Sequence, residues 1–547
     1  MAGSDAPGLR EGLSTVTFGT LALVVATLVY IFLSFIARVL IVRSISIADW
    51  NAFSLGFTLV QVLAAVGSFG IPVAVARGLP FSASESERRT IVRTSLLTGG
   101  IAAASAGFAL ALVAPWIAHA LAAPELVLGL EFFAIAVAGL IASTLLASLF
   151  QGFADVLPNA LFVQILNPAI YVGVLVGARF VAPGRITYET ALLAFAASHV
   201  FTLLALVVYT VSKLPHSLLA RGAADRFARS GFLRLIAPLA VMGGFSSVAT
   251  SGDTLVLGAY HYDQVGAYSA SLTLARLLQV GIVAASYIFL PVASRFLSRR
   301  DERAVRLTYV TVTKWLAVFA LPLFVVFFFL PGGSLDFVFG PSYTAEVLPL
   351  EIVVLGAFLG TLLGPSPMTQ VAFGQVRLVA YNSVAAAVAD VALSLALVPT
   401  YGAVGSGIAW ATANVLFFAL CLAQLSSGEK LNPFGRDFVV PVLALLLPLS
   451  AVLEVVRPKL PLLDLPVLGL GVATLFVLTI LATRSVGEGD RLLLEAVERW
   501  TGIRIPVVRW LVGRLGLRDR TRPVTGPKVP PGSESPSSEP LRGAPPE

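Results

Sequence analysis

The segment Phe232-Leu-Arg-Leu-Ile-Ala-Pro238 opens an apolar run that reaches Asp253-Thr-Leu-Val-Leu-Gly258. After the turn Tyr260-His-Tyr-Asp263, a second apolar run continues from Val265 to Pro291. At a rise of about 1.5 Å per residue, each run is long enough to cross the hydrocarbon core of a bilayer. The stretch therefore predicts a hairpin of two transmembrane helices.

Two charged residues lie inside this hairpin. Arg276 falls near the middle of the second helix, and Asp253 falls in the outer third of the first. An arginine at bilayer depth costs roughly 2.5–3.5 kcal/mol on insertion scales, so it normally faces a partner or a water-filled cavity. Arg276 is therefore interpreted either as a substrate-contacting residue of a transport cavity or as half of an Arg276–Asp253 pair that clamps two helices.

Composition indicates a polytopic membrane protein. Of the 547 residues, 57% are hydrophobic and only 12% are charged, whereas soluble domains carry about 25% charged residues. The single cysteine, Cys421, excludes an intramolecular disulfide, and the four histidines are not spaced as metal ligands. No P-loop, Ser-His-Asp order or pair of extramembrane carboxylates is found. We therefore expect neither an enzyme nor a metalloprotein, and no cofactor.

The hydrophobic pattern predicts an all-α fold of about fourteen transmembrane helices, with two pseudo-symmetric six-helix lobes and two extra C-terminal helices. The predicted order along the chain is an N-terminus (1–14), an N-lobe (15–212), a connector (213–231), a C-lobe (232–426), two further helices (438–483), amphipathic interfacial helices (484–518) and a disordered tail (519–547). With the N-terminus inside, eighteen Lys and Arg fall in the inner connections before the tail, and five in the outer ones. The positive-inside rule then predicts a multi-pass protein of the cytoplasmic membrane with both termini cytoplasmic.

An internal repeat supports the two lobes. Residues Asp49–Gln61 align with Gln264–Arg276 at an offset of 215. Since each half has six spans, the halves should share one orientation and be related by an axis along the membrane normal. The same offset places Arg38 opposite Asp253, which suggests a latch between the lobes. The alternative is that Arg38 snorkels to the outer interface.

Several short motifs, taken in order, resemble one family of membrane proteins, the polysaccharide and oligosaccharide flippases of the multidrug/oligosaccharidyl-lipid/polysaccharide exporter superfamily. The motifs are Ala37-Arg38-Val39-Leu40, Gly67-Ser-Phe-Gly70, Asp253-Thr-Leu-Val-Leu-Gly258, Phe339-Gly340-Pro-Ser-Tyr343, Ala372-Phe-Gly374 and Pro399-Thr-Tyr401-Gly402-Ala-Val-Gly405. The resemblance covers about residues 15–426. It implies two six-helix lobes around a central cavity, and lipid-diphosphate-linked glycans as cargo.

The resemblance also implies site residues. Lipid II flippases of this superfamily use cavity arginines on helices one and eight, and Arg38 and Arg276 occupy those helices here. A guanidinium group suits a diphosphate because it binds oxygens bidentately and stays charged when desolvated. Gln61 and Gln279 are expected either to contact sugar hydroxyls or to be ordinary packing residues. Lys314, near the inner end of the ninth span, is expected to snorkel.

An acidic residue in the eleventh span departs from the family pattern. Asp390 stands where such flippases more often carry an uncharged residue, and Asn382 lies two helical turns earlier. Some relatives place a cation between helices seven and eleven, so Asp253, Asn382 and Asp390 form a candidate sodium or proton site. The alternative is an Asp390 that is paired with a nearby cation or protonated in place.

These observations predict a flippase that moves a polyprenyl-(di)phosphate-linked oligosaccharide by alternating access. Its expected partners are that substrate, membrane lipids and glycosyltransferases or a polymerase of the same pathway, with no nucleic acid. Two alternatives remain: a cation-coupled exporter of small organic cations, and a non-transporting membrane scaffold of a glycan-assembly complex. An exporter of cations should carry acids in its cavity, whereas a scaffold should depend on its basic tail.

Overall fold

The computed structural model of the chain is helical throughout the residues it describes, which are 6–68, 70–82, 84–181, 186–219, 230, 232, 236, 251–344, 347–429, 431–456, 465–483, 485 and 490. Among these residues, twelve helices are long and apolar enough to cross a membrane. The prediction of a polytopic all-α membrane protein is confirmed. The seventh predicted span lies outside the described residues except for its last part, and the apolar section of the thirteenth, Phe438–Ser450, is shorter than the others.

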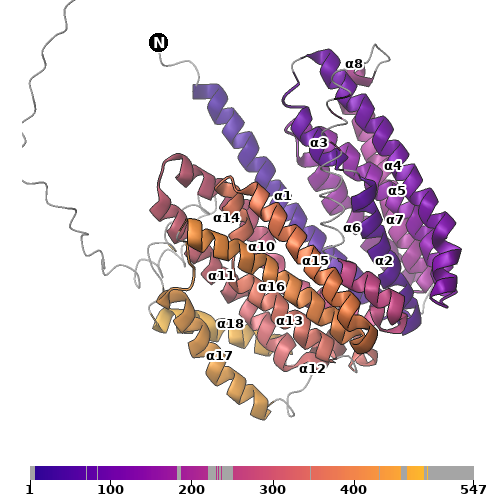
Figure 1. Cartoon of the computed structure of the whole chain (residues 1–547). Coiled ribbons are helices and arrows are strands. Elements are labelled where there is room, and N and C mark those ends of the chain that lie inside the picture. The colour runs from indigo at the N-terminus through magenta and orange to yellow at the C-terminus, as the bar shows by residue number, and fades with distance from the viewer. Residues whose placement is uncertain are drawn as a thin grey trace, which may run out of the picture.

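The N-lobe contains the helices of the first part of the chain. They are α1 (Ala6–Val42), α2 (Ile47–Gly67), α3 (Ile71–Gly78), α4 (Glu85–Ala120), α5 (Glu125–Gly152), the π-helix η1 (Asn159–Leu166), α6 (Asn167–Val181), α7 (Tyr188–Lys213) and α8 (His216–Leu219). In Figure 1 α4, α5 and α7 run side by side, and α5 packs on both of the others.

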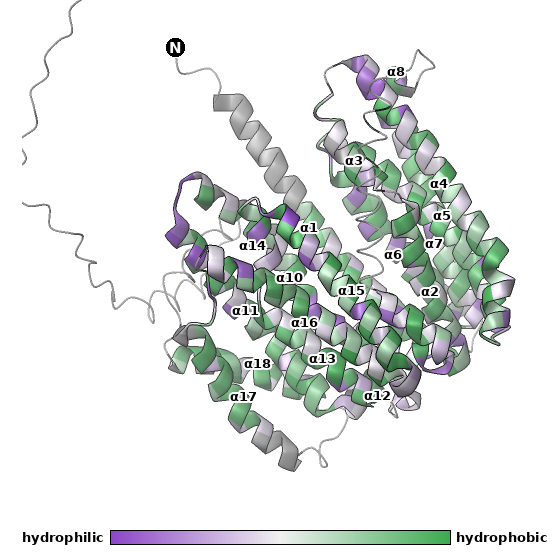
Figure 2. Ribbon diagram, viewed as in Figure 1, coloured by the Kyte–Doolittle hydropathy of each residue, from purple (hydrophilic) through white to green (hydrophobic). Residues whose placement is uncertain are grey.

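The C-lobe follows with a helical segment at 251–260. After it come η2 (Tyr262–Gln264), α10 (Val265–Ser298), α11 (Glu302–Phe329), α12 (Pro331–Phe339), η3 (Pro341–Tyr343), α13 (Val347–Leu362), α14 (Ser366–Ala372), α15 (Val376–Tyr401) and α16 (Ala403–Gly428). Two last helices, α17 (Arg436–Val456) and α18 (Leu465–Ala482), pack against α11 at the side of this lobe. Figure 2 shows apolar residues along most of the helices, with hydrophilic residues gathered mainly toward helix ends.

Side-chain caps explain where several helices begin. Ser46 has an extended backbone, and its hydroxyl accepts from the Asp49 N–H at the start of α2. Ser84 caps α4 in the same way by accepting from the Glu87 N–H. Each cap satisfies a donor that the first helical turn leaves without a partner. The polar turns that precede the apolar runs therefore set the helix starts.

The two lobes meet at one end of the molecule and spread apart toward the other end, where α8 and α14 lie (Figure 1). At the meeting point Trp50 Nε1 donates to Gly266 O at 2.9 Å, and Gly266 N donates to Asn51 Oδ1 at 2.7 Å. Asn51 Nδ2 also donates to Asp263 O at 2.9 Å. We call these four residues the inter-lobe clasp. Asn51 and Gly266 are repeat mates separated by 215 positions, and equivalent residues are expected to meet near an axis that relates the two halves.

Glycine is required at this contact. A Cβ on residue 266 would lie 2.5 Å from Asn51 Oδ1 and 2.6 Å from Trp50 Cδ1. Both neighbours are buried, so neither side chain has room to retreat. The backbones of α2 and α10 therefore approach closely because residue 266 has no side chain.

The environment of Lys314 differs from the sequence-based expectation. Its Nζ lies 2.6 Å from Asp490 Oδ2 and donates to Ser485 O at 2.8 Å, and both charged side chains are buried. Trp315 Nε1 donates to the other Asp490 oxygen at 2.8 Å. Snorkelling was therefore the wrong interpretation of Lys314, because a partner far along the chain reaches it. The other residues of 484–518, and all of 519–547, lie outside the described residues.

Candidate functional site

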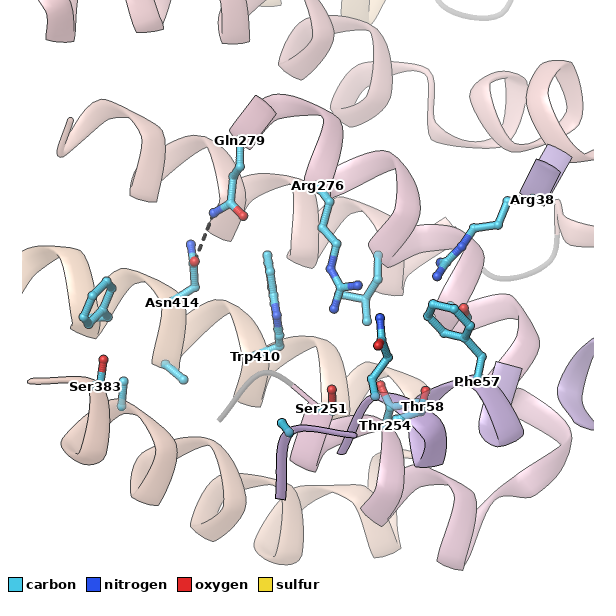
Figure 3. A pocket seen from close by; sticks show the side chains of 17 residues that line it. Arg38, Phe57, Thr58, Ser251, Thr254, Arg276, Gln279, Ser383, Trp410 and Asn414 are labelled. Atoms are coloured by element: carbon cyan, nitrogen blue, oxygen red, sulfur yellow. Dashed lines mark hydrogen bonds between the residues drawn. The ribbon is translucent and has the colours of Figure 1, made fainter. Parts of the chain in front are cut away.

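A cavity of about 710 Å³ lies between the two lobes. The helices α1, α2, α10, α15 and α16 line it together with the segment 251–260 (Figure 3). The polar and aromatic residues that line it include Arg38, Phe57, Thr58, Gln61, Ser251, Thr254, Arg276, Gln279, Ser383, Trp410, Asn414 and Phe417. Its size is within the range of small-molecule sites, roughly 300–1,000 Å³.

Arg38 reaches across the lobe boundary. Its Nη1 donates to Thr273 Oγ1 of α10 at 2.7 Å, and its guanidinium lies 4.9 Å from the ring centre of Phe57. Arg38 therefore does contact the opposite lobe as predicted, but its partner is Thr273 and not Asp253. Since the side chain is half-buried in the cavity wall, Arg38 does not snorkel away from the cavity.

Arg276 presents its side chain to the same cavity. It is exposed although it lies within a membrane-spanning helix, and it points into the space beside Trp410 (Figure 3). It also lies near enough to the buried Asp253 carboxylate to interact with it electrostatically. An exposed guanidinium at this depth implies a water-filled cavity rather than a dry helix interface.

Amide groups extend the polar wall beyond Arg276. Gln279 follows it by one helical turn, and its Nε2 donates to Asn414 Oδ1 at 3.0 Å. Asn414 in turn donates to Gly356 O at 3.0 Å. Gln61, the repeat mate of Arg276, is an exposed residue of the cavity wall on the N-lobe side. The cavity thus combines cationic groups with neutral hydrogen-bonding groups.

The charge of the cavity has one sign. Among the described residues that line it, the only charged side chains are Arg38 and Arg276. The adjoining pocket of about 460 Å³ has the same two arginines, and none of its other described lining residues is charged. A cleft that is lined by charges of one sign and walled by apolar helices concentrates ions of the opposite sign. Such a site favours an anionic ligand.

Two carboxylates lie together behind this wall. Asp253 N donates to Asp390 Oδ2 at 3.2 Å, and the Tyr268 hydroxyl donates to the Asp253 carboxylate. Ser406 Oγ donates to Asp253 O at 3.2 Å. Both acids are fully buried, and Asp390 Oδ1 has no hydrogen-bond partner. Burial of two neighbouring acids is costly unless their charge is compensated, and the Arg276 guanidinium interacts electrostatically with Asp253.

With the geometry described, the comparison with known proteins becomes informative. The sequence profile of the family described as polysaccharide biosynthesis protein matches residues 16–297, which is more than half of the chain. The chain belongs to this family. The match covers the N-lobe and the first two spans of the C-lobe, including both cavity arginines. A search of curated protein sequences finds no match.

Solved structures share the fold of this polysaccharide biosynthesis protein at low sequence identity. A lipid II flippase MurJ in an inward closed conformation superposes with a TM-score of 0.63 at 13% identity, covering 83% of this chain and 97% of that one. An inward-facing multidrug resistance MATE family transporter of the MOP superfamily gives 0.58 at 14% identity, covering 76% and 99%. The chain therefore has the fold of this transporter superfamily.

The structure brings together most of the residues singled out in the sequence. Arg38, Gln61, Arg276 and Gln279 line one cavity, and Asp253 lies against Asp390. Asn382 does not join the two acids. It exchanges hydrogen bonds of 2.9 Å with Gln424 instead, because eight helical residues separate it from Asp390 by roughly 12 Å.

Sequence reasoning missed several cavity residues. Trp410, Asn414 and Ser383 were not predicted, nor were Phe57 and Thr58. A usable signal existed for Asn414 and Ser383, since uncharged polar residues within apolar spans often face a cavity or a neighbouring helix. Trp410 gives no such signal, because an aromatic residue in a membrane helix is equally common in the packed core.

Proposed function

We propose that this protein is a membrane flippase for a polyprenyl-diphosphate- or polyprenyl-phosphate-linked oligosaccharide. The observation that supports this best is the pair of arginines in a cavity between the two lobes, together with the lack of carboxylates among the described residues that line it. A diphosphate carries the complementary charge, and guanidinium groups match its oxygens bidentately. Membership of the polysaccharide biosynthesis family and the transporter fold fit the same cargo.

The clasp and the spreading of the lobes fit a transport cycle. The lobes touch at Trp50, Asn51 and Gly266 and separate toward the opposite end. On the basis of the lysine and arginine distribution, we assign the separated end to the cytoplasm and both termini to the same side. The structure then represents a state open to the cytoplasm, and alternating access requires the clasp to break.

We assign the coupling of transport to the Asp253–Asp390 pair. A bound sodium ion or a proton would compensate the two carboxylates, with Tyr268 as a donor to Asp253. Since the pair lies in the C-lobe directly behind the cavity wall, which includes Thr254, a change in its charge can alter the helix packing around Arg276. Asp390→Asn should abolish the dependence of transport on a sodium or pH gradient, and unchanged gradient dependence would contradict the assignment.

A competing function within transport is export of small organic cations, as in the multidrug members of the fold. The cavity argues against it, because the only charged groups among its described lining residues are cationic. A scaffold without transport activity would not need a positive cavity between lobes. We therefore infer transport of an anionic lipid rather than these alternatives.

Arg276 provides the decisive experiment. If it binds phosphate, Arg276→Lys and Arg276→Ala should both lower flipping of a lipid-linked oligosaccharide in proteoliposomes by about 10- to 150-fold, the effect of losing a charge-assisted hydrogen bond of about 1.5–3 kcal/mol. An ammonium group cannot reproduce the bidentate contact. Membrane abundance should stay near normal, and Arg179→Lys, at the exposed end of α6, is the matched control.

The same series separates cargo binding from helix clamping. If Arg276 mainly compensates Asp253, Arg276→Ala lowers abundance, since removing one partner of a buried pair costs about 3–5 kcal/mol. The double variant Arg276→Ala with Asp253→Asn would then recover abundance and flipping together. That recovery would overturn the cargo-binding role.

A further inference from the structure

A separate hollow of about 310 Å³ lies within the N-lobe, between α1, α5, η1, α6 and α7. We call it the N-lobe chamber. The described residues of its wall include no Asp, Glu, Lys or Arg, and eight of them have uncharged hydrogen-bonding side chains: Thr27, Tyr30, Ser143, Asn159, Gln164, Asn167, His199 and Thr202. A polar hollow within an apolar helix bundle is unusual, because polar groups in a membrane protein normally pair with one another or face a ligand or water.

The chamber has a buried hydroxyl that no described residue satisfies. Ser143 on α5 is only 2% exposed, and its Oγ has no hydrogen-bond partner. Most serines in the described membrane helices donate to a carbonyl of their own helix, as Ser148 does to Leu145 O at 2.6 Å. Leaving a buried hydroxyl without a partner is costly. A group that enters the chamber would supply the partner.

The backbone beside the chamber is also irregular. Residues 159–166 form a π-helix, and Gln164 on it accepts a hydrogen bond from Thr27 Oγ1 at 2.7 Å. That bond uses one acceptor position of the Gln164 oxygen and none of the two amide N–H donors. Because π-helices widen the turn and are frequent at functional sites, this geometry is consistent with a space kept open for binding.

Other chamber groups offer both donors and acceptors. His199 Nδ1 lies 2.9 Å from Phe195 O, so the ring donates there and a neutral ring keeps Nε2 as an acceptor. Asn167 makes only long contacts, at 3.3 and 3.4 Å, with Thr202 and Ser198. The wall can therefore serve a ligand that both donates and accepts hydrogen bonds.

The chamber connects toward the arginines. The pocket of about 460 Å³ shares Tyr30, Asn167 and His199 with the chamber, and it shares Arg38 and Arg276 with the cavity between the lobes. Arg38, Ser34, Tyr30 and Thr27 lie along one face of α1. Eleven residues at about 1.5 Å each place Thr27 roughly 16 Å from Arg38 along the helix. A ligand held at the arginines can thus extend into the N-lobe.

Three ligand types do not fit the chamber. A phosphate would find no cation there, and an organic cation would find no carboxylate. A prenyl tail would cover the polar groups without pairing them, at a desolvation cost. Sugar residues have hydroxyls that donate and accept, and the aromatic walls of the connecting pocket, Tyr30, Phe57, Tyr171 and Phe195, offer flat apolar faces for sugar rings.

We propose that the N-lobe chamber binds uncharged sugar residues of the cargo while Arg38 and Arg276 hold its phosphate groups. This inference rests on the proposed function and adds a second subsite to it. Ser143→Ala tests it cleanly, because the lost hydroxyl has no partner among the described residues and its removal should not lower the thermal unfolding midpoint. Ser148→Ala, on the same helix and outside the chamber wall, is the matched control.

The experiment measures binding to the purified protein in nanodiscs with undecaprenyl diphosphate and with the same lipid carrying a hexose, an N-acetylhexosamine or a disaccharide. We expect at least one glycosylated lipid to bind more tightly than the sugar-free lipid. Ser143→Ala and Asn167→Leu should each reduce that advantage by about threefold to tenfold, the effect of one neutral hydrogen bond. Neither variant should alter the affinity for undecaprenyl diphosphate, whereas Arg276→Ala should weaken all four probes.

The outcomes separate the two claims. If the wild-type protein binds none of the four lipids, the proposed function fails. The chamber is not a sugar subsite if the protein binds the sugar-free lipid as tightly as every glycosylated lipid. The same holds if the higher affinity for a glycosylated lipid is unchanged in Ser143→Ala and Asn167→Leu. In both cases the phosphate role of the arginines stands. If Ser148→Ala reduces the affinity advantage of the glycosylated lipid as much as Ser143→Ala does, the effect is not specific to the chamber and counts against it.

Discussion

The inter-lobe clasp predicts that Gly266→Ala will shift the protein away from the state described here. The new Cβ would lie 2.5 Å from Asn51 Oδ1 and 2.6 Å from Trp50 Cδ1, and Trp50 and Asn51 are only 1% and 4% exposed. The clash would break the contacts between the two lobes that close this end of the cavity. Two of the three clasp hydrogen bonds involve the Gly266 backbone itself.

The magnitude follows from these contacts. Overpacking of a buried contact costs about 1–3 kcal/mol, and each lost hydrogen bond adds about 0.5–1.5 kcal/mol. With both Gly266 hydrogen bonds lost, a total of roughly 2–6 kcal/mol changes the ratio of closed to open clasp by about 30- to 20,000-fold. Asn51→Ala removes hydrogen bonds without a clash, so its shift should be smaller.

Cysteine accessibility provides the assay. In a Cys421→Ser background, Thr58→Cys on α2 places one thiol in the cavity wall. A membrane-impermeant maleimide added from the clasp side should label it slowly in the parent and much faster after Gly266→Ala. Gly173→Ala is the control, because a Cβ there meets nothing within 4 Å. Labelling at the parental rate in Gly266→Ala, with normal abundance, would refute the clasp as the closed gate.

Three further predictions concern packing and topology. Lys314→Met should lower the thermal unfolding midpoint in detergent, because it removes the cation of a buried ion pair, at a cost of about 3–5 kcal/mol; adding Asp490→Leu should restore most of the loss, and an additive loss would contradict a direct pair. Gly402→Ala should reduce the amount of folded protein measured by fluorescence-detected gel filtration, since residue 402 has φ +53° and its Cβ would lie 2.2 Å from a glutamine oxygen; an unchanged monodisperse peak would contradict this. Cysteines at positions Ser86 and Ser342 should be labelled from opposite sides, with Ser86 cytoplasmic, and labelling of both from one side would overturn the assigned orientation.

The membrane architecture was readable from the sequence because it depends on local composition. A sufficiently long apolar run identifies a membrane span whichever helices it packs against. Twelve of the predicted spans are recovered in the described residues. The repeat at an offset of 215 predicted equivalent helices, and the structure shows its mates Asn51 and Gly266 in contact.

Charged residues were the informative part of the site. Arg38 and Arg276 could be placed in a cavity because an arginine within a membrane span normally faces a partner or water, since its exposure to lipid is costly. Partners were harder to predict, since they depend on how helices rotate and pack. Arg38 contacts Thr273 rather than Asp253, and nothing near Lys314 in the sequence indicated Asp490 as its partner.

The Lys314–Asp490 pair also has a consequence for biosynthesis. The two residues are separated by 176 positions, so at about 5–20 residues per second the lysine is synthesised roughly 9–35 s before the aspartate. During that interval α11 carries an uncompensated cation that its final environment buries. The nascent C-lobe must therefore remain beside water, lipid head groups or an insertion chaperone until the last helices arrive. A chain that ends before residue 490 lacks the carboxylate that pairs with Lys314 in the folded protein.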